Sequence, residues 1–311
     1  MNSFIKDFFK LSNYIKFLKN PGKIKIIFNR LNYYPGVKFA HSKSYIYRYL
    51  EISLTIFLAK RNKCFQNIFF KIKKDNKNSI YQDLSEKNSI SEKHIDIISS
   101  KGVLVLENIL DKNELSEIQN YLSSLKDNDY DEIVDMGDSE RKFKSFSLDS
   151  LKKIEFISNE ITEKVYGQVV QPKTAILKTV AKNIPERDST GDNIYHPDRY
   201  LPNIKLFFNP FEVSKKGAPF MFALGSHQIT KKYLNFYKKT KQWFFDERNL
   251  DSKIFLENKT DIPVKANSLI VACTNGFHGR SKFLDYLDRT VIVLTYSNFN
   301  FLSLIRSKKA N

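Results

Sequence analysis

Residues 203–228 read NIKLFFNPFEVSKKGAPFMFALGSHQ, in which two short apolar runs (204–208 and 219–224) flank a turn rich in Pro, Gly, Ser and Lys. Apolar runs of this length, bounded by turn residues, are typical of β-strands. Similar runs stand on both sides of this stretch, at 174–182, 193–196, 268–274 and 290–297. The chain downstream of Gly167 is therefore predicted to form an antiparallel sandwich or barrel.

Helical patterns precede this β-region. Ser89 and Glu92 resemble a capping box, which predicts the start of a short helix, and Asp111 with Glu114 predicts the cap of a second one. A third helix carries an apolar stripe between residues 154 and 165. We expect an α+β fold in which helices flank a mainly β core.

The first 77 residues differ in charge from the rest. They hold 17 basic and three acidic side chains, in a chain whose formal net charge is +17. Phe4, Phe8 and Leu11 recur at helical spacing between lysines, so we expect a basic, aromatic-rich helical extension. Two interpretations stand: the extension lies on an anionic membrane surface, or it packs on the main domain with its lysines in solvent. Residues 78–94 are polar and predict a linker, and 95–311 form the main domain.

Composition excludes several classes of protein. The longest apolar-type run, 52–59, has eight residues, whereas a membrane-spanning helix needs about 20. The N-terminus has no continuous apolar stretch followed by a cleavage site, so a secretory signal is not expected. The two cysteines, Cys64 and Cys273, form no CxxC pair, which disfavours a disulfide framework or a Cys-rich zinc site. We expect a cytoplasmic protein; if the extension lies on a membrane surface, the protein is also peripheral at the membrane.

One group of residues has the types and order of a metal site. His196 and Asp198 are separated by one residue, so in extended backbone they project from the same face. His278 follows the predicted strand 268–274, and Arg289 opens the predicted strand 290–297. Two imidazoles and one carboxylate, with no thiolate, match the facial triad of non-haem iron oxygenases. Arg289 shares a strand face with apolar neighbours, which would place its guanidinium inside the barrel as a partner for a carboxylate.

The segment 203–228 resembles the strand–turn–strand of the phytanoyl-CoA dioxygenase family, including its Gly225-Ser226-His227. The resemblance covers about residues 95–300 and implies a double-stranded β-helix. It also implies Fe(II) bound by His196, Asp198 and His278, with 2-oxoglutarate and O2 as co-substrates. Arg289 would hold the distal carboxylate of 2-oxoglutarate, and Lys178 would also touch the co-substrate.

This resemblance implies a dioxygenase that hydroxylates or desaturates an unactivated C–H bond and releases succinate and CO2. Because Asp198 occupies the position that halogenases of this fold leave open for halide, halogenation is disfavoured. The substrate would be a small molecule, lipid-like or bound to a carrier. Alternatives are a zinc-type or non-catalytic metal-binding member of the fold, and an oxygenase that modifies nucleic acid. The last is disfavoured because the excess positive charge lies in the extension.

Three further features are open to interpretation. The segment 228–262 interrupts the predicted strands and contains Trp243, so it forms either a lid over the site or a pair of surface helices. His227 is expected to cap a turn rather than bind the metal. Arg280 and Lys282 are expected to be loop charges in solvent, or to face the mouth of the pocket.

Overall fold

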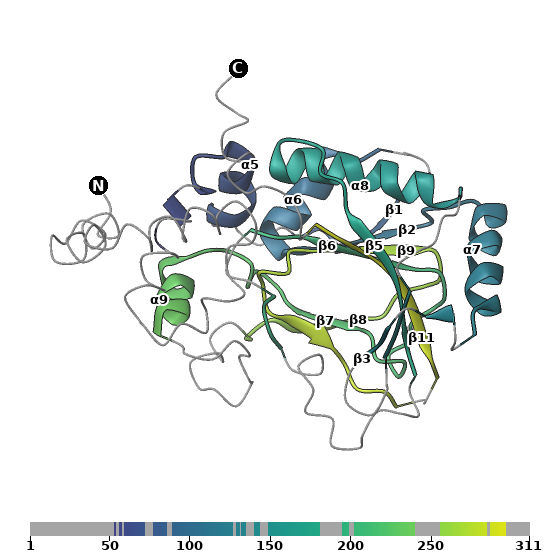
Figure 1. Cartoon of the computed structure of the whole chain (residues 1–311). Coiled ribbons are helices and arrows are strands. Elements are labelled where there is room, and N and C mark those ends of the chain that lie inside the picture. The colour runs from purple at the N-terminus through teal and green to yellow at the C-terminus, as the bar shows by residue number, and fades with distance from the viewer. Residues whose placement is uncertain are drawn as a thin grey trace, which may run out of the picture.

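The computed structural model describes residues 53, 56–57, 59–71, 77–85, 89–126, 129–130, 132–134, 140–143, 149–180, 195–198, 202–239, 256–284 and 287–296. Strands in these ranges form a large and a small sheet that face each other (Figure 1). The large sheet has eight strands in the order β1 (Tyr81–Asp83), β2 (Val103–Glu107), β9 (Ser268–Ala272), β6 (Lys205–Asn209), β11 (Arg289–Thr295), β5 (Lys173–Thr179), β4 (Glu140–Phe143) and β3 (Glu132–Val134). Its pairs are antiparallel except for β1 with β2.

The small sheet places β7 (Phe220–Ala223) between β10 (His278–Arg280) and β8 (Lys259–Ile262). The backbone of His196 pairs with that of His278 in an antiparallel bridge, which adds a short fourth segment beside β10. Strands β7 and β8 are joined through a long connection that contains helix α9 (Lys231–Lys239). In sequence order, therefore, the two sheets exchange strands repeatedly, as in a barrel closed by antiparallel pairs.

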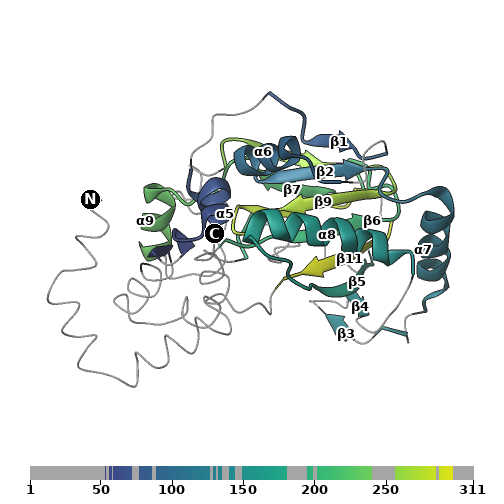
Figure 2. The ribbon, with the colours of Figure 1, turned by 90° about the horizontal axis from the view of Figure 1, so that it is seen from above.

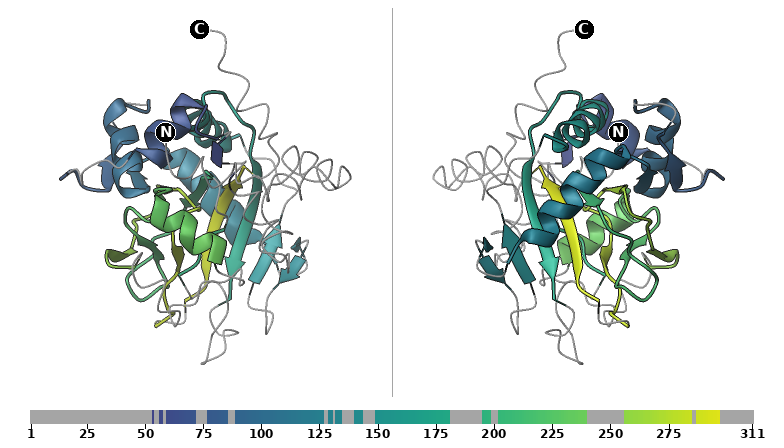
Figure 3. Two further views of the ribbon diagram at one scale, coloured as in Figure 1. Left: turned by 90° about the vertical axis from the view of Figure 1, so that its left-hand side faces the viewer. Right: turned by 90° about the vertical axis from the view of Figure 1, so that its right-hand side faces the viewer.

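Helices cover the outer face of the large sheet. Figure 2 shows α6 (Glu92–Lys101) and α8 (Leu151–Tyr166) lying over its strands, on the side away from the small sheet. Nearby lie the short α5 (Lys63–Phe65) and a π-helical turn, η1 (Gln66–Phe70). Helices α7 (Lys112–Ser124) and α9 lie on opposite sides of the molecule (Figure 3).

Side chains that point to opposite faces of the large sheet form two separate apolar cores. Leu104 of β2, Val271 of β9 and Ile292 of β11 point outward into a core shared with the helices. Val103 of β2 and Ile270 of β9 point inward, where they pack with residues of β7 and β8 between the two sheets. Because successive side chains of a strand face opposite ways, β2 and β9 each contribute to both layers.

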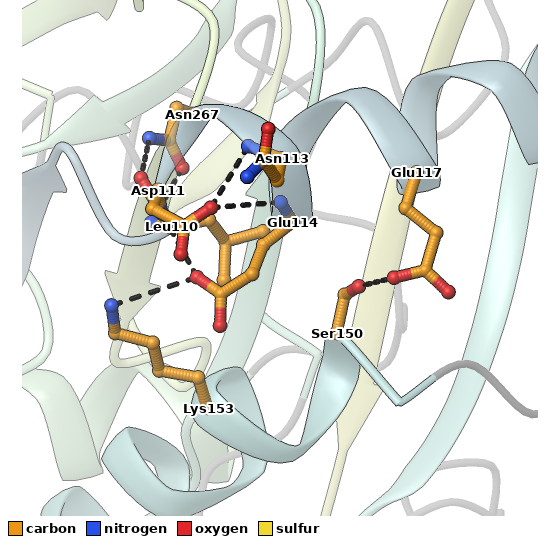
Figure 4. A network of polar contacts seen from close by, with 8 residues as sticks. All are labelled: Leu110, Asp111, Asn113, Glu114, Glu117, Ser150, Lys153 and Asn267. Atoms are coloured by element: carbon orange, nitrogen blue, oxygen red, sulfur yellow. Dashed lines mark hydrogen bonds and ion pairs between the residues drawn. The ribbon is translucent and has the colours of Figure 1, made fainter.

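Helix α7 is fixed at its first turn by a network of polar contacts (Figure 4). Asp111 Oδ1 accepts hydrogen bonds from the amides of Asn113 (2.8 Å) and Glu114 (2.9 Å), and Glu114 Oε2 accepts one from the Asp111 amide (2.8 Å). This is the capping box that the sequence predicts. The Asn267 side chain bonds both the amide and the carbonyl of Leu110, which ties the helix to the start of β9.

Other boundaries follow the sequence with two corrections. Gly102 and Gly167 end α6 and α8 in the left-handed conformation (φ 82° and 80°). The N-cap of α6, however, is Ser91 rather than Ser89, because the His94 side chain accepts a hydrogen bond from the Ser91 amide (3.2 Å) and completes the box. Within the predicted linker 78–94, residues 81–83 form the edge strand β1.

The end of the predicted extension is part of the main fold. Phe65 and Phe69 are fully buried in the outer core, and Phe65 meets the ring of Tyr166 edge-on at 5.7 Å between centroids. Asn62 caps α5 and donates through Nδ2 to the carbonyl of Tyr166 (3.0 Å). The described residues between 56 and 71 therefore follow the packed interpretation. Residues 1–52 lie outside the described part of the chain, so both interpretations stand for them.

Candidate metal centre and its cavity

A cavity of about 320 Å³ lies between the two sheets, beside the inner apolar core. Its walls are the inward-facing residues of β4, β5, β6 and β11 on one side, and β10 with residues 196 and 198 on the other. The half of the barrel formed by β2, β9, β7 and β8 is filled by apolar side chains, whereas this half is lined by polar and charged groups as well. A volume of this size is at the lower end of that of small-molecule sites.

His196, Asp198 and His278 meet in this cavity. One ligand atom from each lies within 4.8 Å of the other two. The backbones of His196 and His278 exchange two hydrogen bonds (2.8 and 2.9 Å), and the Asp198 amide donates to the carbonyl of Thr274 (2.8 Å). Two stretches that are 80 residues apart in sequence are thus held side by side, which sequence spacing alone does not ensure.

His278 is prepared to bind a cation through Nε2. Its Nδ1 lies 2.9 Å from the carbonyl oxygen of Gly276, and because a carbonyl only accepts, Nδ1 carries the proton. The Nε2 atom then has its lone pair available and lies 3.8 Å from Asp198 Oδ1. Burial, only partly opposed by the Asp198 carboxylate, lowers the pKa of His278 to about 4, so the ring is neutral at neutral pH. Neutral imidazole is the form that binds metals.

Asp198 is ionised in the same conditions. Burial alone would raise the pKa of this carboxyl, but the positive charge of Lys205 and the two neighbouring imidazoles hold it well below its usual range. Lys205 Nζ lies 2.9 Å from Asp198 Oδ2, whereas Oδ1 faces His278. One carboxylate oxygen is therefore held by a lysine while the other faces His278, which suits a monodentate ligand.

The turn that carries His278 is supported by the Gly225-Ser226-His227 segment. Ser226 Oγ accepts from the Phe277 amide (2.8 Å), and the His227 carbonyl accepts from Asn275 Nδ2 (2.7 Å). A Cβ at Gly276 would lie 2.8 Å from Cζ of Phe222 and 2.9 Å from both the His227 amide nitrogen and Ser226 Oγ, so only glycine fits there. The His227 ring is buried away from the three ligands and donates through Nε2 to the carbonyl of Ser99 (3.2 Å).

Arg289 faces the cavity, as its strand position predicts. It lines the wall together with Val291 and Val293, the alternate residues of β11. Its Nη1 donates to the carbonyl of Ala218 on the facing side of the barrel (3.0 Å). A guanidinium has five N–H donors, so this contact orients the group and is compatible with bidentate binding of a carboxylate.

Lys178 is the predicted site residue that the structure does not bring to the cavity. On β5 the residues that line the cavity are Ala175, Leu177 and Thr179, so Lys178 faces the opposite side of the sheet. There its Nζ lies 3.7 Å from Asp288 Oδ2. The expectation that Lys178 touches a co-substrate is therefore wrong for this structure, because the odd-numbered residues of β5 face the cavity and Lys178 points to the other face of the sheet.

Three cationic residues of the cavity wall were not assigned to the site from sequence: Lys142 on β4, Lys205 on β6 and Arg280 on β10. Arg280 is only 7% exposed, which contradicts its interpretation as a loop charge in solvent, and it lines the cavity, in agreement with the alternative that it faces the pocket. The available signal was spacing: Arg280 stands two residues after His278 and so shares its strand face. Of the segment 228–262, the described residues do not line the cavity, and Trp243 lies outside the described part of the chain.

The residues present suit a divalent metal ion such as iron. They offer two imidazole nitrogens and one carboxylate oxygen around one point, with room in the cavity for further ligands. The fold and the site together define a double-stranded β-helix protein with a candidate two-histidine, one-carboxylate centre.

Comparison with known proteins supports the fold. The chain is similar to the non-heme alpha ketoglutarate dependent carbocyclase SnoK from nogalamycin biosynthesis, at 12% identity and a TM-score of 0.51, over 67% of this chain and 83% of that one. The epimerase SnoN, solved with Fe3+, alpha ketoglutarate and nogalamycin RO, gives 13% identity and a TM-score of 0.49, over 67% and 83% of the two chains. HygX from Streptomyces hygroscopicus, solved with nickel, 2-oxoglutarate and hygromycin B, gives 15% identity and a TM-score of 0.42, over 66% of this chain and 86% of that one. Neither a family model nor a curated protein matches the sequence. The likeness to SnoK confirms the double-stranded β-helix predicted from sequence.

Among the described residues, every helix is too short or too polar to cross a membrane.

Proposed function

We propose that this protein is an Fe(II)- and 2-oxoglutarate-dependent dioxygenase that hydroxylates or desaturates an unactivated C–H bond of a small-molecule, lipid-like or carrier-bound substrate. The observation that carries the proposal is that one cavity contains both the three-ligand centre and Arg289. SnoK, whose name describes an alpha ketoglutarate dependent enzyme, supports it through the shared fold.

In this proposal, His196, Asp198 and His278 hold the iron. An iron ion held by these residues would supply the chemistry by which one atom of O2 goes into the succinate formed from 2-oxoglutarate, with release of CO2, and the other into the hydroxyl group of the product. Hydroxylation is then balanced: one substrate C–H becomes C–OH, and one molecule each of O2 and 2-oxoglutarate is consumed. The metal carries the difficult chemistry, and the protein provides binding, orientation and exclusion of water.

The chain's own residues carry out these tasks. Arg289 binds the distal carboxylate of 2-oxoglutarate, held in orientation by Ala218. The ring of Phe220 stacks on His278 (5.7 Å between centroids) and contacts Phe207 (5.1 Å), so two aromatic groups shield the ligands on the side of the inner core. Such shielding lowers the local dielectric constant and strengthens the charge pairs in the site.

Anaerobic reconstitution tests the proposal. Full-length protein with Fe(II) and 2-oxoglutarate should develop a metal-to-ligand charge-transfer band in the visible, and His278→Ala should not. Adding O2 should then give succinate. Binding of Zn(II) but no charge-transfer band with Fe(II) and 2-oxoglutarate would favour the zinc-type alternative and contradict the proposal.

A further inference from the structure

The two oxygens of the Asp198 carboxylate have different partners. Oδ1 lies 3.8 Å from His278 Nε2, whereas Oδ2 lies 2.9 Å from Lys205 Nζ. The Asp198 and Lys205 side chains are 19% and 25% exposed, so their contact is largely shielded from water. An ionised carboxylate accepts at both oxygens at once, so a metal ion on Oδ1 does not need to displace the lysine from Oδ2.

The short link between Asp198 and Lys205 is held at both ends by Thr274. The Thr274 carbonyl accepts a hydrogen bond from the Asp198 amide (2.8 Å), and the Thr274 amide donates to the carbonyl of Asn203 (2.9 Å). The Asn203 side chain donates through Nδ2 to Thr274 Oγ1 (2.8 Å), and both residues are buried. The chain therefore leaves the turn near His278 at Asp198 and comes back to the same turn just before Lys205.

The large sheet fixes Lys205 as well. Lys205 opens β6 and pairs in register with Ala272 of β9 on one side and with Thr295 of β11 on the other. The amide of the preceding residue, Ile204, donates to the Tyr166 hydroxyl (3.0 Å). Since the backbone is held from both sides, the Lys205 side chain lines the cavity at a defined place beside the metal ligands.

We propose that Lys205 is a positioning residue that keeps Asp198 a one-oxygen ligand and so leaves a metal position free for 2-oxoglutarate. This inference rests on the proposed function, which places the co-substrate on the metal. A carboxylate binds metal ions through one oxygen or through both, and a two-oxygen aspartate would take one position more. Partners of metal ligands orient the ligands. Because this partner is itself a cation, its removal releases Oδ2 and also removes a repulsion on the metal ion, so the loss should fall on the co-substrate.

The first test uses full-length protein with Mn(II) alone and measures the relaxation of water protons, which increases with the number of water molecules on the ion. Lys205→Met keeps much of the side-chain length but removes the charge. Its relaxation enhancement per bound Mn(II) should be about a third lower than that of the wild type, because Asp198 Oδ2 fills one of the positions left open beside the facial triad. Lys205→Arg restores a charged N–H donor and should lie closer to the wild type. Equal enhancement in Lys205→Met and in the wild type would overturn the inference.

The second test is calorimetry of 2-oxoglutarate binding to the Ni(II) protein. Lys205→Met should bind Ni(II) at least as tightly as the wild type, but 2-oxoglutarate at least about tenfold more weakly. A parallel loss of Ni(II) and 2-oxoglutarate binding, together with a lower melting temperature, would show that Lys205 supports the fold and would overturn the inference too. If Lys205→Met does not fold, Lys205→Ala takes its place in both tests with the same expected results.

Lys178→Met is the matched control, since this lysine stands on the outer face of the large sheet. It should behave like the wild type in both tests. A wild-type Ni(II) protein that does not bind 2-oxoglutarate would contradict the proposed function, whereas the Mn(II) test would still decide whether Lys205 keeps Asp198 a one-oxygen ligand.

Discussion

Replacing Arg289 by glutamine tests the assignment of the co-substrate site. Arg289 is partly buried in the wall of the cavity, and its position is fixed by the hydrogen bond to Ala218. Glutamine keeps a polar group of smaller reach at the same place but removes the positive charge. We therefore expect Arg289→Gln to bind 2-oxoglutarate weakly while it binds the metal as the wild type does.

The expected size of the effect follows from the environment of the guanidinium. Truncating one partner of a hydrogen-bonded charge pair costs about 2–5 kcal/mol when the pair is buried. Arg289 is only partly buried, so we take the lower part of this range, about 2–3 kcal/mol. Since each 1.4 kcal/mol is a factor of ten, the dissociation constant for 2-oxoglutarate should rise roughly 30- to 150-fold. Arg289→Lys keeps the charge but not the planar fork, so its dissociation constant for 2-oxoglutarate should lie between those of the wild type and of Arg289→Gln.

Anaerobic titration of the Fe(II) protein with 2-oxoglutarate, followed by the visible charge-transfer band, measures this constant directly. Lys178→Gln serves as the control, because it removes a cation from the outer face of the neighbouring strand β5. Equal 2-oxoglutarate affinity in the wild type and in Arg289→Gln would refute the assignment. A loss of metal affinity as large as the loss of 2-oxoglutarate affinity would show that Arg289 supports the fold of the site instead.

Other consequences can be measured independently. Asp198→Asn should lower the affinity for Fe(II) or Ni(II) by at least about 100-fold in calorimetry, since even outer partners of ligands contribute 10- to 100-fold; an unchanged circular dichroism spectrum would show that the fold survives. His227 is fully buried, and burial lowers its pKa to about 4 from 6.5, so the unfolded state binds more protons between these pH values. The free energy of unfolding should therefore fall as the pH drops from about 6.5 to about 4, by up to about 1.4 kcal/mol per pH unit for this group. The slope in urea unfolding should be smaller in His227→Gln, and an unchanged slope would contradict the shifted pKa. Phe65→Ala should cost about 3–5 kcal/mol in the same assay, because the ring is fully buried; a cost under about 1 kcal/mol would mean that this segment is not part of the core. Deleting residues 1–52, which hold ten basic and two acidic side chains, should reduce sedimentation with anionic vesicles at low salt, and equal sedimentation of both proteins would exclude a membrane role for them.

The sequence predicts much of the β-region because inner and outer residues alternate on strands such as β11. There the alternation by itself places Arg289, Val291 and Val293 on one face, and all three line the cavity. Parity does not show which face is the inner one, because β11 and β5 both carry apolar residues on both faces. On β11 the face of Arg289 is the inner one, whereas on β5 the face of Lys178 is the outer one. The run TAILKTVAK has apolar residues at both parities, since Ile176 enters the outer core and Leu177 the cavity wall, so the sequence does not show which way Lys178 points.

The contact between Lys205 and Asp198 illustrates a second limit. The two residues are close in sequence, but Lys205 reaches Asp198 because the chain leaves the small-sheet side after residue 198 and enters the large sheet at β6. That crossing depends on which sheet each strand joins, and strand partners are set by contacts distant in sequence. The order of His196, Asp198, His278 and Arg289 is visible in the sequence, but the places of Lys142 and Lys205 beside them become visible only when the barrel is closed.

The division of the barrel into a filled and an open half has a consequence for how such a protein can change over evolutionary time. Val103, Ile270 and Phe222 close one half with apolar contacts, and residues such as Lys142 and Leu177 face the other half, where little packing depends on them. Substitutions in the open half therefore alter what is recognised at small cost to folding, whereas substitutions in the filled half are selected against whatever the substrate is. A lineage with this architecture can acquire new substrates by exchanging a few wall residues while the metal ligands and the apolar half stay as they are.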